Sequence, residues 1–154
     1  MGQNDPQGPL MTTPDNEWQR IWFATRQQSW TSLTLLPIAA DIDVTRAAEM
    51  LAATGCLHGE RQVGVVNATG AQLEDVQQTI DSIKARNGRG EWTIVPVDPI
   101  EHNPATIAIL RATSAALLLV RLGESRLAPA QKIIEMIGRD RTIGSIVLKR
   151  HRDR

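Results

Sequence analysis

Apolar runs and amphipathic stretches alternate along the whole chain. Strand-like apolar runs occupy residues 32–38, 61–68, 91–98, 114–122 and 142–149. Helix-like stretches begin near residues 15–17 and then cover residues 42–54, 70–86, a segment from 103 onward, and 128–138. The later strand-like runs are apolar at successive positions, so both faces of these strands are expected to be buried. The pattern predicts a three-layer α/β/α fold around a mostly parallel sheet of about five or more strands.

Capping residues mark the ends of the expected helices. The expected N-terminal caps are Asp41 or Asp43 for helix 42–54, a Thr69-x-x-Gln72 capping box for helix 70–86, and Asn103, followed by Pro104, for the fourth helix. Gly55 is expected to end helix 42–54, because glycine accepts the left-handed backbone that terminates many helices.

Length and composition suit one soluble domain, since the chain has 154 residues and 42% of them are hydrophobic. We expect a flexible arm over residues 1–15, a single domain over 16–149 and a basic tail over 150–154. The N-terminus lacks the pattern of a signal peptide, and the run "AALLLV" is far shorter than the roughly 20 residues of a membrane span. A single cysteine, Cys56, excludes an internal disulfide. These features predict a cytoplasmic protein with no transmembrane segment.

The charge balance gives no sign of a nucleic-acid partner. Lys and Arg total 17 residues, as do Asp and Glu, so the formal net charge is zero at pH 7. Nucleic-acid-binding domains usually carry a basic stripe. The local excess in "KRHRDR" (149–154) predicts either a solvated terminus or a contact with an acidic partner or lipid headgroups.

The carboxyl ends of the strands are the places to look for a ligand, because open α/β sheets bind ligands there. After the first strand comes "PIAADIDVTRAAEMLA" (37–52), where a phosphate loop would have glycines and a lysine. This stretch has neither: Val44 stands at the lysine position, and Asp41 and Asp43 would repel a triphosphate. Only Thr45 keeps a suitable hydroxyl. The stretch predicts a capped turn without a bound phosphate.

The other strand ends offer few groups for metal or proton chemistry. Asn67 and Thr69 are neutral, so we expect them to be turn and cap residues rather than metal ligands. Asp98 is either a Mg²⁺ ligand or a solvated loop carboxylate, and the adjacent Glu101-His102 dipeptide could form an acid–base pair. Arg121 is either a surface ion-pair residue or an anion contact. We expect no metal site and no cofactor.

The second half of the chain resembles a known family. The segments "LRATSAALLLVRLG" (110–123) and "IGSIVLK" (143–149) are similar to those that follow the Walker B strand in the cytoplasmic domain of bacterial tyrosine kinases (BY-kinases). That domain belongs to the MinD/ParA-type P-loop ATPase superfamily, and the likeness covers residues 16–149. The segment "EWQRIWFATR" (17–26) stands where the family has a Glu-x-x-Arg-x-x-Arg helix used for self-association. Glu17 and Arg20 match that helix, whereas Phe23 replaces its last arginine and Arg26 lies nearby.

The family's catalytic motifs are replaced in this chain. Its Gly-Lys-Ser/Thr loop becomes "DIDVTR" (41–46), its acidic second-strand motif becomes "NAT" (67–69), and its third-strand motif becomes "PVDPI" (96–100). The chain contains no tyrosine, so the acceptor cluster of such kinases is missing. The resemblance therefore implies a degenerate member, a pseudo-ATPase with no catalytic residues. Its degenerate nucleotide-loop positions are Asp41, Asp43, Val44, Thr45, Asn67 and Asp98.

Three functions are compatible with the sequence. The first is a catalytically inactive accessory or scaffold subunit of a bacterial exopolysaccharide system, bound to a polysaccharide synthase, a chain-length regulator or a sibling ATPase at the inner membrane. The second is a non-standard nucleotide-binding phosphotransferase that uses Thr45, Asp98 and Arg121. The third is a receiver-like phosphoacceptor domain, which Asp41, Asp43, Asp98 and Lys149 imitate.

The aromatic residues gather near the N-terminus. Trp18, Trp22, Phe23 and Trp30 are four of the five aromatic residues of the chain. The helix that carries them either docks on its own domain or presents a partner-binding face, since tryptophan is enriched at interface anchors. The candidate partner-binding residues, for a protein partner or for a homo-oligomer, are Glu17, Trp18, Arg20, Trp22, Phe23 and Arg26.

Overall fold

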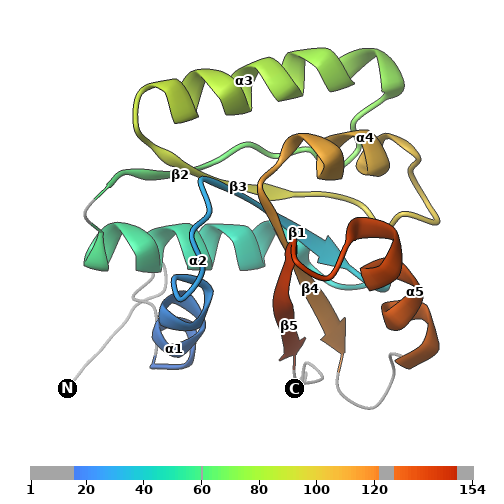
Figure 1. Ribbon diagram of the computed structural model, residues 1–154, viewed down its shortest axis with the longest axis horizontal. Coiled ribbons are helices and arrows are strands. Elements are labelled where there is room, and N and C mark those ends of the chain that lie inside the picture. Colours follow the sequence, from blue (N-terminus) through green and yellow to red (C-terminus); the bar gives the residue numbers. More distant parts are fainter. Residues whose placement is uncertain (1–15, 60, 122–126, 149–154) are drawn as a thin grey trace.

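A five-stranded parallel sheet forms the centre of the molecule (Figure 1). The strand order is β2 (Val63–Val65), β3 (Trp92–Pro96), β1 (Ser32–Pro37), β4 (Ala115–Arg121) and β5 (Thr142–Leu148). This sheet confirms the predicted α/β fold class. The computed structural model describes residues 16–59, 61–121 and 127–148. The expected arm over 1–15 and the basic tail over 150–154 lie outside the described residues.

Helices cover both faces of the sheet, as Figure 1 shows. One face carries α1 (Asn16–Thr25) and α2 (Val44–His58), and the other carries α3 (Val76–Gly88), α4 (Ala105–Ala112) and α5 (Leu127–Ile137). The connection from β1 to β2 runs toward one end of the sheet, whereas each later connection runs the opposite way. Because crossovers between parallel strands are right-handed, this reversal places α2 on one face and the three later helices on the other.

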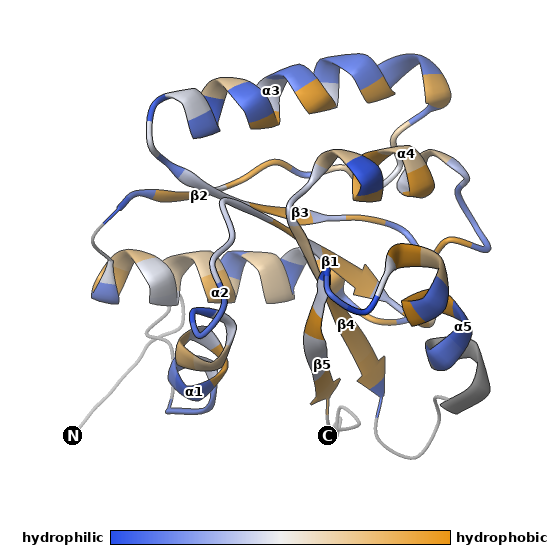
Figure 2. Cartoon of the chain, viewed as in Figure 1, coloured by the Kyte–Doolittle hydropathy of each residue, from blue (hydrophilic) through white to orange (hydrophobic). Residues whose placement is uncertain are grey.

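The core consists of two apolar clusters, one on each face of the sheet, because the central strands are apolar on both sides. Leu33 and Leu35 of β1 face the cluster under α1 and α2, while Leu36 faces the cluster under α3, α4 and α5. In β4, Leu117 and Leu118 point to opposite clusters in the same way, and both are at most 4% exposed. In Figure 2 the arrows of β1 and β4 are mostly orange, whereas α3 shows blue residues away from the sheet. The run of successive apolar positions therefore predicted this two-sided burial correctly.

The prediction that Gly55 ends a helix is wrong. Helix α2 continues through Gly55 to His58, and Gly59 follows it in an extended conformation. Gly55 lies against Trp22 of α1, and a Cβ atom at this position would lie 2.6 Å from Cη2 of that ring. The glycine is thus required by close helix–helix contact and not by a left-handed turn.

The capping prediction for α2 is confirmed, whereas those for α3 and α4 differ from the structure. The Asp43 carboxylate accepts a hydrogen bond from the Arg46 amide at 3.1 Å, which confirms Asp43 as the cap of α2. The Asn103 side chain accepts from the amide of Ala105 at 3.0 Å, but α4 begins at Ala105 with Pro104 as its N-cap residue, so the predicted cap is wrong by one position.

The Thr69-x-x-Gln72 capping box is wrong, since the box joins Gln72 to Asp75 at a short 3-10 turn (η2, Leu73–Asp75) before α3. The Thr69 hydroxyl is occupied by a 2.7 Å hydrogen bond to Asn67, and Gly70 then turns the chain with a φ of 74°. The helix therefore begins later than its sequence pattern indicated.

Candidate functional site

The carboxyl ends of the strands carry two hydrogen-bonded polar groups. The first joins the loop after β1 to the end of β4, where Arg121 donates from Nη2 to the Asp41 carbonyl oxygen at 3.0 Å. The Arg121 Nε atom also lies 3.4 Å from an Asp41 carboxylate oxygen. The second group joins the loops after β2 and β3 through Asp98. Strand order explains the pairing, because β1 neighbours β4 and β2 neighbours β3.

The N-terminus of α2 is closed by its own chain. The Ile42 amide donates to Ala39 O, the Val44 amide donates to Ile42 O, and the Arg46 and Ala47 amides donate to the side chain and carbonyl of Asp43. A phosphate loop works by directing several backbone amides into one cavity. Here these amides are engaged within the turn, and a carboxylate stands at the positive end of the helix dipole.

A hollow of about 490 Å³ lies beside this turn. It is lined by two carboxylates, two guanidinium groups and three other side chains: Asp41, Asp43, Arg46, Arg121, Trp18, Ala47 and Leu148. The Arg121 side chain is 12% exposed, so its ion pair with Asp41 is partly shielded from solvent. A phosphate entering this hollow would meet two negative charges as well as two positive ones.

Asp98 is a connector between loops. Its Oδ2 atom accepts hydrogen bonds from the Gly70 amide at 2.7 Å and from Asn103 Nδ2 at 2.9 Å. Asn103 also donates to Ala71 O, and the Thr106 hydroxyl donates to the Asp98 carbonyl. These contacts give Asp98 a positioning role that neither sequence interpretation included. Asn103 is the residue that could have revealed this role of Asp98, but its place in the sequence indicated only a helix cap.

Among the residues that the structure describes, the remaining ionisable candidates do not gather into a metal-binding cluster. Within residues 16–59, 61–121 and 127–148, no three His, Cys, Asp or Glu side chains approach as a metal ion would require. Glu101 and His102 are both exposed in the loop after β3. Lys149, which the receiver-like alternative needs, lies outside the described residues.

An apolar hollow at the same edge was not anticipated from the sequence. It measures about 340 Å³ and is lined at the ends of β1 and β3 by Pro37, Ile38, Pro99 and Ile100, and on α5 by Lys132, Ile133 and Met136, with Glu101 beside them. Met136 is 57% exposed. The available signal was Pro37, which ends β1, together with Pro99 in the loop after β3, because proline cannot continue strand pairing.

The candidate partner-binding residues of α1 divide between the core and the surface. Trp22 is 3% exposed and belongs to the core, so its side chain does not face a partner. Trp18 is partly buried, whereas Glu17 and Arg20 are exposed. Phe23 is 53% exposed, and its ring lies 4.8 Å from that of His58 on α2.

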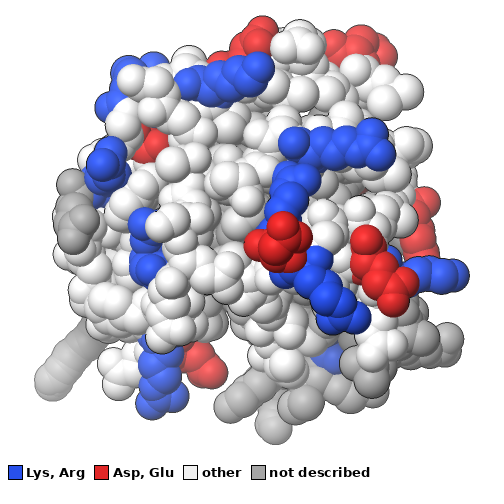
Figure 3. All heavy atoms as spheres, viewed as in Figure 1, with Lys and Arg blue, Asp and Glu red and all other residues white. Residues whose placement is uncertain are grey.

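Charges on the face seen in Figure 3 are mixed. Blue Lys and Arg atoms and red Asp and Glu atoms are interspersed there, without a broad patch of one sign among the residues drawn in colour. A separate observation concerns membranes: none of the described helices combines the length and the apolar character that crossing a bilayer demands.

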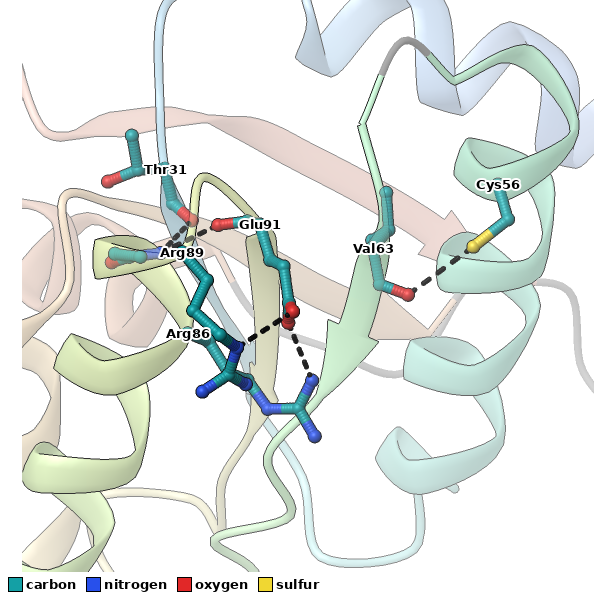
Figure 4. Close-up of polar contacts among 7 residues, drawn as sticks. Thr31, Cys56, Val63, Arg86, Arg89 and Glu91 are labelled. Carbon is teal, nitrogen blue, oxygen red and sulfur yellow. Dashed lines mark hydrogen bonds and ion pairs between the residues drawn. The ribbon is translucent and has the colours of Figure 1, made fainter.

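A second polar cluster lies at the amino ends of the strands. Glu91, just before β3, accepts hydrogen bonds from Arg86 and Arg89, each at 3.1 Å (Figure 4). Asn87 donates from Nδ2 to Thr31 O and to Glu91 O, both at 3.0 Å. This cluster ties the end of α3 to the starts of β1 and β3.

The pKa of Glu91 provides a test of the contacts within this cluster. The hydrogen bond from Arg89, followed by the positive charges of Arg89 and Arg86, holds the pKa of the Glu91 carboxyl below its ordinary value of 4.5. The stabilisation from ionised Glu91 is therefore present above pH 4.5 and is lost as pH falls through the lowered pKa. We expect Arg89→Gln to raise the Glu91 pKa measured by NMR, and Arg139→Gln, at an exposed site after α5, to leave it unchanged. An unchanged value in Arg89→Gln would contradict the assignment.

Comparison with known proteins identifies the fold. No protein-family model matches the chain, and no curated protein matches it in sequence. The kinase domain of the Escherichia coli tyrosine kinase ETK matches in structure with a TM-score of 0.67 and 12% identity, over 87% of this chain and 74% of that one. The chimerical protein CapA2B2 matches with a TM-score of 0.70 and 11% identity, over 94% and 88%. The BceF tyrosine kinase domain matches at 0.61 and 12%, over 86% and 74%. The chain therefore has the P-loop NTPase-like α/β fold of these tyrosine kinase domains.

Proposed function

We propose that this protein is a catalytically inactive, P-loop-like accessory or scaffold subunit of a bacterial exopolysaccharide system, and that it acts by binding other proteins. The observation that carries the proposal is the closed N-terminus of α2. Asp43 accepts a hydrogen bond from the Arg46 amide there, and the amides of Ile42 and Val44 donate within the turn itself. The fold shared with tyrosine kinase domains supports the choice of system.

Electrostatics at the turn oppose a nucleotide. Asp41 and Asp43 both line the hollow beside α2, and the Arg121 charge is already directed to Asp41. A triphosphate would have to displace the carboxylate cap and approach a second carboxylate. The two arginines of the hollow are thereby matched by two acids, so the site has no excess positive charge to offer a phosphate.

Two surfaces support protein binding. The exposed Phe23 ring contacts the His58 ring at a tilt of 56°, and His58 also forms a 3.1 Å hydrogen bond with Gln19, so α1 and α2 present one shared surface. Leu57, next to His58, is 65% exposed. The apolar hollow at the end of β3 provides a second place for a partner's apolar side chain. Large exposed apolar groups of this kind are typical of interaction sites.

Calorimetry with ATP and ADP in the presence of Mg²⁺ tests whether the protein binds a nucleotide. We expect no saturable binding by the wild-type protein below about 1 mM, against the micromolar range of a working nucleotide site. Asp41→Asn with Asp43→Asn removes both negative charges and serves as the matched variant, so any affinity it gains measures their repulsion. Micromolar binding of either nucleotide by the wild-type protein would overturn the proposal.

Affinity purification from the native host tests the partner. We expect a polysaccharide synthase, a chain-length regulator or a sibling ATPase to co-purify with the wild-type protein and to be reduced by Phe23→Ser. Leu73→Ser is the control, because Leu73 is also exposed (68%) but lies on the turn before α3, away from α1. Recovery of no polysaccharide-system component, or equal loss with both variants, would count against the scaffold role.

A further inference from the structure

We propose that two copies of this chain pair through the outer edge of β5, so that their sheets join into one across a twofold axis. β5 forms one edge of the sheet and lies beside β4 (Figure 1). Among the described residues it pairs with β4 alone. The pairing requires neither an inactive nucleotide site nor a polysaccharide partner, so it goes beyond the proposed function and is tested separately from it.

The outer edge of β5 offers hydrogen-bonding groups to another strand. Every second residue of an edge strand points both its N–H and its C=O away from the sheet. Proteins commonly guard such an edge with a very short strand, a charged side chain or a proline. The sequence of β5, "TIGSIVL", has seven residues and contains neither a charged residue nor a proline. Its outer edge is therefore suited to accept another strand.

One irregularity restricts the regular part of this edge to the carboxyl end of β5. The register with β4 skips Ile143, which is an extra residue in the strand. Such a bulge disrupts strand pairing locally. From Gly144 to Leu148 the register with β4 is regular, and this segment is centred on Ile146. We therefore place the twofold axis at Ile146.

Helices leave both faces of this segment partly uncovered. On the face that carries α5, Ser145 is exposed and Val147 is 53% exposed. On the opposite face, a hollow of about 270 Å³ lies between α1 and β5, and Ile21, Ile143 and Ile146 are among its lining residues. A strand added at the edge of β5 would cover the exposed side chains on one face and extend alongside the hollow on the other.

The two edges of the sheet differ, and this difference favours a closed dimer. The other edge strand, β2, has only three residues, and the Arg86 guanidinium lies directly over Gly64 in its middle. β2 is thus too short to serve as the partner of β5 in an open head-to-tail series of copies. Two β5 edges, in contrast, pair with each other in antiparallel orientation, which is self-complementary and closes after two copies.

The position of the axis fixes which side chains meet. With the axis at Ile146, Val147 of each copy lies opposite Ser145 of the other copy. The two Val147 residues then occupy diagonal positions on the same face, about 7–8 Å apart. Val147 is therefore the position at which a charge would act most directly on the dimer.

Sedimentation equilibrium of the full-length chain tests the proposal. We expect the 17.0 kDa monomer to be in equilibrium with a dimer of about 34 kDa, with a Kd below about 100 µM. Hydrogen exchange gives a local readout, because backbone amides within Gly144–Leu148 should exchange more slowly as the protein concentration rises through the Kd. The amides of β2 should show no such dependence on concentration.

Variants locate the interface. Val147→Lys should raise the dimer Kd about tenfold, because the axis brings two like charges together at an edge that was apolar. Val147→Glu should do the same, and an equimolar mixture of the two variants should recover the dimer, since opposite charges then meet. Leu57→Lys is the matched control: Leu57 is 65% exposed on α2, and this variant should keep the wild-type Kd.

Three results would overturn the proposal. One is a mass of 17.0 kDa at every concentration up to about 1 mM, which is about ten times the largest Kd expected. Another is slow exchange of the Gly144–Leu148 amides that does not depend on concentration, which would mean that another part of the same chain already occupies the edge. The third is an unchanged Kd in Val147→Lys, or an equal loss in Leu57→Lys, with circular dichroism equal to that of the wild-type protein.

Discussion

Trp22→Ala is expected to lower the free energy of unfolding by about 3–5 kcal/mol, the range for truncating a large buried aromatic side chain. Trp22 is 3% exposed and fills the space between α1, α2 and the sheet. Its ring meets Trp30 edge-on at 5.8 Å and Trp92 at 6.0 Å, so the substitution removes two aromatic contacts as well as buried area.

Urea unfolding followed by circular dichroism measures this effect. Phe23→Ala is the matched control, because Phe23 is the next residue of α1 and is 53% exposed. We expect the control to cost less than about 1 kcal/mol, as is usual for surface positions. Similar costs for both variants would show that α1 does not dock through Trp22.

Gly55→Ala is expected to destabilise the protein by about 1–3 kcal/mol, the cost of overpacking a filled core. Alanine favours a helix over glycine by about 1 kcal/mol, so helix propensity alone predicts the opposite sign. The added Cβ would lie 2.6 Å and 2.7 Å from two ring atoms of Trp22, a rigid group with buried neighbours. The clash is therefore expected to outweigh the gain in propensity.

A double-mutant cycle isolates that clash. In the Trp22→Ala background the ring is gone, so Gly55→Ala should become neutral or stabilising. The reversal of sign between the two backgrounds is the expected result of thermal and urea unfolding. The same destabilisation in both backgrounds would mean that Gly55 is required for its backbone conformation and not for the contact with Trp22.

Local patterns were sufficient to predict the sheet but not the role of Gly55. The run in β4 is apolar at successive positions, and two-sided burial follows from that fact alone. A glycine after an amphipathic stretch, in contrast, either ends the helix or allows another element to approach. Only the position of Trp22, which belongs to a different helix, decides between these outcomes.

The candidate site likewise contains one contact that the sequence could predict and others that it could not. Asp43 was predicted as a cap because its partner, the Arg46 amide, is three residues away. The contacts of Asp41 with Arg121 and of Asp98 with Gly70 depend on which strands become neighbours in the sheet. No pattern within one segment of the chain contains that information.

The central position of β1 has a consequence for synthesis. This strand is the first of the five in the chain, yet its neighbours are β3 and β4, and Ser32 is joined to Ser114 across a separation of 82 residues. At about 5–20 residues per second, the ribosome needs roughly 4–16 s to make that intervening length. During this time β1, which carries no charged residue, is present without β4, and for most of it without β3 as well. The nascent chain must therefore keep β1 from pairing with other exposed strands until β4 emerges.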